Sequence, residues 1–172
     1  MSNDNSLFEL RISSLRNAAE ISQQWATHTI SILDTELTKT IFATSIFYES
    51  YEELIPKPGD QLSLHRCYFD DVTPADNFGL ILPTLADIQA ILVFSANLTS
   101  HDKLLVHCSA GISRSTAVAT GILCQHGLSP IAALGKVFSI RRIAVPNSYI
   151  IALMDEALEL NGELNDALLS YY

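Results

Sequence analysis

One short stretch of this 172-residue chain, HCSAGISRS at residues 107–115, combines residue types that could carry out covalent chemistry on an anion. Cys108 stands six residues before Arg114, and only small or uncharged residues lie between them: Ser109, Ala110, Gly111, Ile112 and Ser113. A loop of such residues can turn successive backbone N–H groups toward one point, where they hold phosphate oxygens. The planar guanidinium group of Arg114 would bind two oxygens at once. The same positive field favours the thiolate of Cys108, which is the nucleophilic form of cysteine.

Two regular elements are expected to position this loop. KLLVH at 103–107 is a short, almost wholly apolar run, which is typical of a central parallel strand covered on both faces. The residues after the loop follow a helical pattern that ends at Gly127, a residue type common just past a helix C-terminus. The loop therefore opens a helix, and the first N–H groups of a helix lack internal partners and attract anions.

HCSAGISRS resembles the HCxxGxxR[ST] signature of the cysteine-based protein tyrosine and dual-specificity phosphatases, and the compact chain resembles their bacterial-type members. The resemblance implies that Cys108 is the nucleophile that becomes phosphocysteine and that Arg114 binds the phosphoryl group. It implies that His107 orders the loop and that Ser115 assists departure of the thiolate. The resemblance covers most of the chain from about Thr27 onward. A chance pairing of cysteine and arginine is the simpler interpretation, but the matching His, Gly and Ser positions argue against it.

A proton donor is expected on a loop upstream, because a phenolate leaves more easily near neutral pH when it is protonated. YFDDVTPADN at 68–77 offers three candidates, Asp70, Asp71 and Asp76. In the resembling family the acid directly precedes a small apolar residue with a proline close behind, which selects Asp71 before Val72. Asp70 remains the alternative. Aspartates in such a loop can also serve only to solvate it or to cap the next helix.

A third resemblance lies in IRRIAVPNSY at 140–149, which is similar to the R-P-x-x-x-P-N segment that precedes the last helix in the same family. Arg141, Pro146 and Asn147 match, whereas Arg142 stands where proline is usual. Asn147 is expected to have a structural role at the start of that helix; a role in orienting water is the alternative.

The remaining patterns indicate an α/β fold in one domain spanning 1–172, with a central, mainly parallel sheet flanked by helices and the phosphate loop between a central strand and a helix. Strands are expected at 7–12, as an edge strand, and at 27–34 and 61–69. Helices are expected after Ser13 or Ser14, from about Pro83, from Ser129–Pro130 and from Pro146–Asn147. The segment 38–48 could be a strand or a short helix, 70–77 is a loop, and the tail to Tyr172 either packs or frays.

Composition excludes several classes of partner. The formal net charge is −9 and the ten basic residues are scattered, so the chain lacks the basic stripe of a nucleic-acid or anionic-membrane binder. No apolar run approaches the ~18 residues of a membrane span, and no signal peptide is evident. Three cysteines without close spacing favour a reduced, cytoplasmic protein with Cys67 and Cys124 as packed thiols. A protective disulfide between Cys67 and Cys108, as some phosphatases form, is the alternative. No metal-ligand spacing occurs, and no cofactor is expected.

The function expected from these features is metal-independent hydrolysis of phosphotyrosine in a protein or peptide substrate, through phosphocysteine. Phosphoserine and phosphothreonine would reach Cys108 only in a shallow pocket, and an inositide is disfavoured because the loop has none of the lysines that lipid phosphatases of this superfamily carry. Trp25, Tyr48 and Tyr51 could line the pocket. The alternatives are a phosphate-binding pseudophosphatase or interaction module and a rhodanese-like sulfurtransferase, neither of which needs Asp71.

Overall fold

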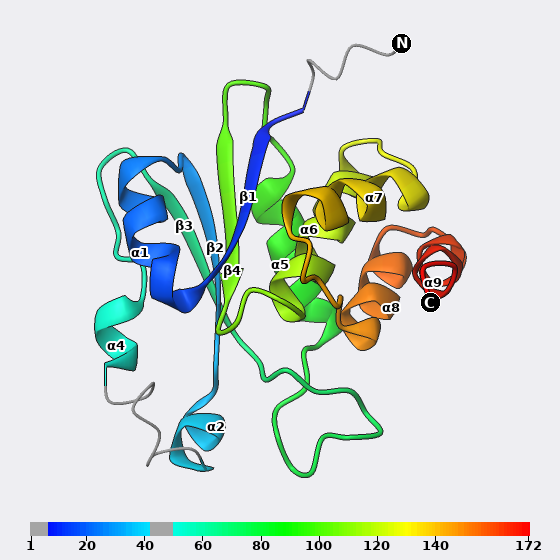
Figure 1. Cartoon of the computed structure of the whole chain (residues 1–172), viewed down its shortest axis with the longest axis horizontal. Coiled ribbons are helices and arrows are strands. Elements are labelled where there is room, and N and C mark those ends of the chain that lie inside the picture. The colour runs from blue at the N-terminus through cyan, green and yellow to red at the C-terminus, as the bar shows by residue number, and fades with distance from the viewer. Residues whose placement is uncertain (1–6, 42–49) are drawn as a thin grey trace.

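The computed structural model describes residues 7–41 and 50–172, in which four strands form one parallel sheet (Figure 1). The strands are β1 (Glu9–Ser14), β2 (His28–Leu33), β3 (Ser63–Tyr68) and β4 (Lys103–Cys108). Their order is β1-β4-β2-β3, so β4 is an inner strand and β1 is an edge strand, as the sequence predicts. Five successive residues of β4, from Leu104 to Cys108, are buried, which is why its sequence does not alternate.

Helices cover both faces of the sheet (Figure 1). On one face, α1 (Leu15–Gln24) and the short α4 (Tyr51–Leu54) enclose a small core around Leu15, Leu33 and Tyr51. The other face carries five helices and the larger core: α5 (Leu85–Ser95), α6 (Arg114–Gln125), α7 (Pro130–Ile140), α8 (Ser148–Ala157) and α9 (Glu163–Leu169). One more short helix, α2 (Glu36–Ile41), follows β2 directly. The predicted α/β class is thus confirmed.

Helix α6 is the most deeply enclosed of these helices. Every residue from Arg114 to Leu123 is buried, because α7, α8 and β4 all pack against it. Gly121 allows α8 to approach closely, since a Cβ atom at this position would lie 2.5 Å from Cγ of Met154. The first turn of α6 is therefore held in a fixed place relative to the carboxyl end of β4.

The helix boundaries agree with the sequence patterns with one correction. Ser129 caps α7 through its side chain, with Pro130 as the first helical residue, and Asn147 caps α8. Helix α5 begins at Leu85 and not near Pro83. The reason is a capping box: the Thr84 hydroxyl accepts from the backbone N–H of Asp87, whose carboxylate accepts from the N–H of Thr84.

For two segments, the tail to Tyr172 and residues 38–48, the sequence left the secondary structure open. The tail packs as α9, whose first turn is anchored by Asp155: this carboxylate accepts from the backbone N–H groups of Gly162 and Leu164 at 2.7 Å each. Of the segment 38–48, the part up to Ile41 belongs to α2, and the rest lies outside the described residues.

Within the described ranges, no helix combines the length and apolar character needed to cross a bilayer.

Candidate active site

The loop at 109–113 connects β4 to α6 at the carboxyl ends of the strands, and its path requires glycine at position 111. Gly111 has φ +68, a backbone conformation that side chains disfavour. A Cβ atom there would lie 2.5 Å from the carbonyl carbon of Ser13, which belongs to β1. The backbone N–H of Leu15 also donates to the carbonyl of Ser109, so β1 and the start of α1 support the loop from below.

The thiol of Cys108 lies at the base of this loop and is buried, with 2% of the residue exposed. The backbone N–H of Gly111 donates to its Sγ at 3.3 Å, and Oγ of Ser115 lies 3.2 Å from the same sulfur. Within the described part of the chain, the backbone N–H groups of Ala110, Ile112 and Ser113 have no protein acceptor. Donors on small residues around a thiol form a cradle for a tetrahedral anion.

Arg114, the first residue of α6, sends its side chain back beneath the loop and is 3% exposed. Its Nη2 donates to Oδ1 of Asp34 at 2.6 Å and its Nη1 to the carbonyl of Phe69 at 2.8 Å. Nε is buried and has no partner among the described residues. Burial by itself lowers the pKa of Arg114, but the nearby Cys108, Asp34 and Asp71 charges outweigh it and raise the pKa above its ordinary value. The side chain is therefore a fixed cation, and its Nε is a buried nitrogen without an acceptor among the described residues.

His107 is fully buried beside Cys108. Its Nε2 hydrogen-bonds to Oγ of Ser31 on β2, and its Nδ1 lies 3.5 Å from the carbonyl of Cys108. Burial is the main reason why the pKa of His107 falls to about 4, and the charge of Arg114 lowers it further. The ring is neutral at pH 7 and fixes the backbone that carries the thiol.

The structure separates the two neighbouring aspartates of the upstream loop. Asp71 is exposed, and its Oδ1 accepts from Oγ of Ser113 at 2.7 Å and from Nδ2 of Asn147 at 2.9 Å. These bonds bring the carboxylate to the rim of the loop at 109–113, where the sequence predicts a proton donor. Whether Asp71 has that role stays a prediction.

Asp70 and Asp76 lie elsewhere. Asp70 is 1% exposed and accepts from Thr35, from Thr38 and from the backbone N–H of Ile81, which ties the start of the loop to α2. Burial alone would raise the pKa of Asp70, but these hydrogen bonds lower it below its usual value. Asp76 is exposed and bonds within its own loop to Thr73.

The segment 141–147 supports the loop from the other side. Arg141 donates from Nε to the carbonyl of Gly111 at 2.8 Å and from Nη2 to that of Ala110 at 3.2 Å. Asn147 has two structural roles: its Oδ1 caps α8, and its Nδ2 holds Asp71. Arg142, at the position where proline is usual, is exposed.

Asp34 is a site residue that the sequence patterns did not identify. It follows β2 at the carboxyl edge of the sheet, and its Oδ2 accepts from Oγ of Ser109 at 2.7 Å. The backbone N–H of Asp34 in turn donates to Oη of Tyr51 at 2.7 Å. The feature of the sequence that could have identified Asp34 is its position at the carboxyl end of a predicted strand, because residues that follow adjacent parallel strands meet at one edge of the sheet.

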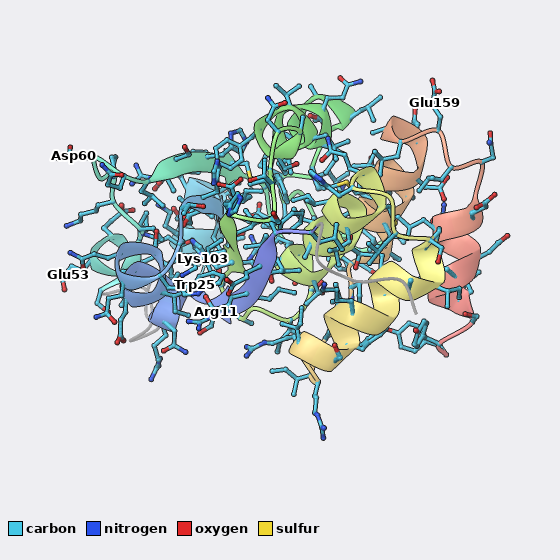
Figure 2. All side chains as sticks on the ribbon, turned by 90° about the horizontal axis from the view of Figure 1, so that it is seen from above. Arg11, Trp25, Glu53, Asp60, Lys103 and Glu159 are labelled. Carbon is cyan, nitrogen blue, oxygen red and sulfur yellow. The ribbon has the colours of Figure 1, made fainter. Side chains whose placement is uncertain are left out.

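The three aromatic residues considered for the pocket have different positions. Trp25 stacks under Arg11, whose Cζ is 4.3 Å from the ring centroid, near Lys103 at the amino end of β4 (Figure 2). Tyr51 is 1% exposed, so it does not line an open pocket, but its hydroxyl lies beneath the loop and hydrogen-bonds to the backbone N–H of Asp34 and to the side chain of Ser109. Tyr48 lies outside the described residues.

The two remaining cysteines are free thiols, as expected. Cys67 lies on β3, and β2 separates it from Cys108 on β4, a span of two strand spacings or roughly 9.6 Å. A disulfide needs Cα atoms closer than about 7 Å. Burial raises the pKa of Cys67, and burial followed by Asp155 raises that of Cys124 to about 11. In the described parts of the chain, no three His, Cys, Asp or Glu side chains gather as a metal site.

This sheet, its helices and the loop between β4 and α6 are arranged as in the dual-specificity and tyrosine phosphatases. The structure is similar to human DUSP28, with 22% identity, a TM-score of 0.55, and 88% of this chain and 92% of that chain covered. It is also similar to the human tyrosine phosphatase-like serine/threonine/tyrosine-interacting protein, with 20% identity, a TM-score of 0.59, and coverage of 88% and 92%. Tk-PTP in its active form has 19% identity and a TM-score of 0.52, with coverage of 91% and 97%. No protein-family model and no curated protein matches the chain. These identities support a shared fold.

Proposed function

We propose that the protein hydrolyses phosphotyrosine in protein or peptide substrates through a phosphocysteine intermediate. The observation that carries this proposal is the buried, unpartnered Nε of Arg114 in the same loop as the thiol of Cys108. A buried donor without an acceptor is costly, and a phosphoryl oxygen over the loop would satisfy it. The free amides of the loop would hold the remaining oxygens.

In the first step, the thiolate of Cys108 attacks phosphorus, an S–P bond forms and the P–O bond to the leaving group breaks. Asp71, at the rim, donates its proton to the departing oxygen. Arg114 and the loop amides stay bound to the phosphoryl oxygens throughout, so the charge that spreads over them in the transition state is stabilised by fixed donors.

In the second step, water attacks phosphorus, Asp71 takes up a proton from that water and the S–P bond breaks. Cys108 leaves as a thiolate, and the hydroxyl of Ser115, 3.2 Å from the sulfur, donates a hydrogen bond to it. Asn147 and Ser113 position the Asp71 carboxylate for both steps through the bonds described above. Neither step needs a metal or a cofactor.

The choice of a protein substrate rests on charge. PTPMT1 has been solved in complex with PI(5)P, and its structure matches this chain with 16% identity and a TM-score of 0.53. The loop of this protein has no lysine between Cys108 and Arg114 to bind further phosphates, and the net charge is −9. A single phosphorylated side chain therefore suits the site better than a polyphosphorylated headgroup.

Neither alternative function would require all the residues that lie together at this site. A pseudophosphatase or interaction module would not need a nucleophile, an arginine and an acid around one loop, and a rhodanese-like sulfurtransferase would not need the acid. We keep phosphoester hydrolysis as the proposal because Cys108, Arg114, Ser115 and Asp71 are all present and lie together.

The test is turnover of p-nitrophenyl phosphate by the full chain in EDTA. We expect activity in EDTA, its loss in Cys108→Ser, and its retention in the matched control Cys124→Ser, which changes a thiol on α6 outside the loop. Full activity of Cys108→Ser would show that the mechanism is wrong. Turnover of thiosulfate but not of phosphate esters would support the sulfurtransferase instead.

A further inference from the structure

A groove of about 550 Å³ opens beside the candidate active site and shares three residues with it. These are Asp71, Ser113 and Asn147, which are joined by the hydrogen bonds that place the proposed acid. The rest of its wall is largely apolar and comes from the acid loop, from the segment before α8 and from the end of α9: Val72, Val145, Pro146, Leu168, Leu169 and Tyr172. Helices α8 and α9 lie side by side on this part of the molecule (Figure 1).

The groove presents apolar side chains to solvent. Val145 is 55% exposed, Leu169 is 72% exposed and Tyr172 is 76% exposed, whereas the neighbouring Leu168 is buried and anchors α9 to the core. Single exposed apolar residues are ordinary, but several around one groove mark a binding surface.

The position of the groove indicates what would bind there. A phosphoryl group in the loop places its leaving oxygen against Asp71, so the chain that carries this oxygen must leave the site over the residues next to Asp71. Within three residues an extended peptide spans roughly 10 Å, enough to lay a flanking side chain in the groove. A small aryl phosphate has no such flanking group.

The charges that line the groove restrict which flanking side chain of a peptide can bind there. Among the described residues that line it, the only carboxylate or cationic side chains are the two carboxylates of Asp71 and Asp76. An acidic flanking residue would be repelled by these carboxylates and would gain nothing from the apolar wall.

We propose that this groove binds one large apolar side chain within three residues of the phosphorylated residue of a peptide substrate. Leu169 and Tyr172 are then specificity-determining residues that act on peptides alone. The inference rests on the proposed phosphatase function. Because the contact is the same before and during the reaction, it lowers KM and leaves kcat unchanged.

The experiment uses phosphotyrosine peptides in which one leucine is moved through three positions on each side of the phosphotyrosine, against a parent with serine there. We expect one leucine position to lower KM about tenfold. The double variant Leu169→Ala, Tyr172→Ala should lose this preference and keep wild-type turnover of p-nitrophenyl phosphate. Val93→Ala is the matched control, since Val93 is 75% exposed on α5, outside the groove, and it should keep the preference.

Each outcome separates the two proposals. If the wild type turns over p-nitrophenyl phosphate but no leucine position lowers KM, or if the double variant keeps the preference, the groove proposal is wrong and the phosphatase stands. If neither substrate is turned over, the proposed function fails and the groove proposal falls with it. If the wild type is a dimer and the double variant a monomer, the groove is a contact between copies and the proposal is overturned. Thermal unfolding checks that the double variant is folded.

Discussion

Asp34 and Arg114 form a buried ion pair beneath the phosphate loop, with Oδ1 of Asp34 2.6 Å from Nη2 of Arg114 and about 4% of each side chain exposed. Asp34 also accepts from Ser109, whose Oγ lies 3.2 Å from the same Nη2. Asp34 and Ser109 together hold Nη2 of the guanidinium, whereas Nε has no partner among the described residues. The carboxylate thereby orients the cation that we propose to bind the phosphoryl group.

We predict that Asp34→Asn lowers kcat/KM for p-nitrophenyl phosphate by about tenfold to a hundredfold, because an uncharged partner no longer fixes the guanidinium. The inhibition constant of inorganic phosphate should rise with it. Asp34→Ala should also lower the free energy of unfolding by about 3–5 kcal/mol, since it leaves a buried charge unpaired. Glu36→Gln, at an exposed carboxylate on α2, is the control. Wild-type kinetics in Asp34→Asn would contradict the orienting role.

Asp71→Asn and Asp70→Asn should have different effects although the residues are adjacent. We expect Asp71→Asn to slow turnover of aryl phosphates by ~10²-fold or more with little change in stability, because it removes a proton donor at an exposed position. Asp70→Asn should lower the melting temperature, because the Asp70 carboxylate accepts several hydrogen bonds from α2 and its own loop. Rates are compared per folded molecule. Slow turnover in Asp70→Asn together with normal turnover in Asp71→Asn would show that Asp70 is the proton donor.

Gly111→Ala and Gly127→Ala test whether the loop needs space as well as a left-handed backbone. Both glycines have positive φ, but a Cβ atom at 111 meets the backbone of Ser13 and Ser14, whereas at 127 it meets nothing within 4 Å. Gly127→Ala should cost about 1 kcal/mol of stability and leave activity intact. Gly111→Ala should abolish most turnover, because the loop must move. Equal activity in the two variants would show that the close approach is unimportant.

The stability of the protein should decrease as the pH falls from 6.5 toward 4. The ring of His107 has a pKa of about 4 in the folded chain, mainly because of burial, and of about 6.5 when unfolded. Between these values the unfolded chain binds a proton at this ring that the folded chain does not, so the free energy of unfolding rises with pH there, and His107 contributes roughly 3 kcal/mol to the rise.

Chemical denaturation across this pH window measures the effect, with His107→Asn expected to flatten the profile and His101→Asn, at an exposed ring, expected to leave it unchanged. Should His107→Asn not fold, the His107 ring resonances in the wild type provide the check. Titration of that ring near pH 6.5 would contradict the prediction.

Local patterns were enough to predict the loop, the strand before it and the helix after it, because each depends on neighbouring residues. Gly127, Ser129 and Asn147 marked helix ends for the same reason.

Asp34 could not be found this way, because its proximity to Arg114 depends on β2 lying next to β4 in the sheet. The separation of Asp70 from Asp71 likewise depends on Thr35 and Thr38 packing against one of them. Helix α9 was missed because its seven residues are too short for a periodic signal.

The placement of β2 between Cys67 and Cys108 determines which thiols can react with Cys108 after it is oxidised. A sulfenic acid at Cys108 cannot be captured by Cys67 across two strand spacings, and Cys124 lies at the far end of α6. The sequence contains no fourth cysteine. A disulfide that captures the oxidised sulfur therefore requires a thiol supplied by the surroundings, because none of this chain's own thiols is within reach.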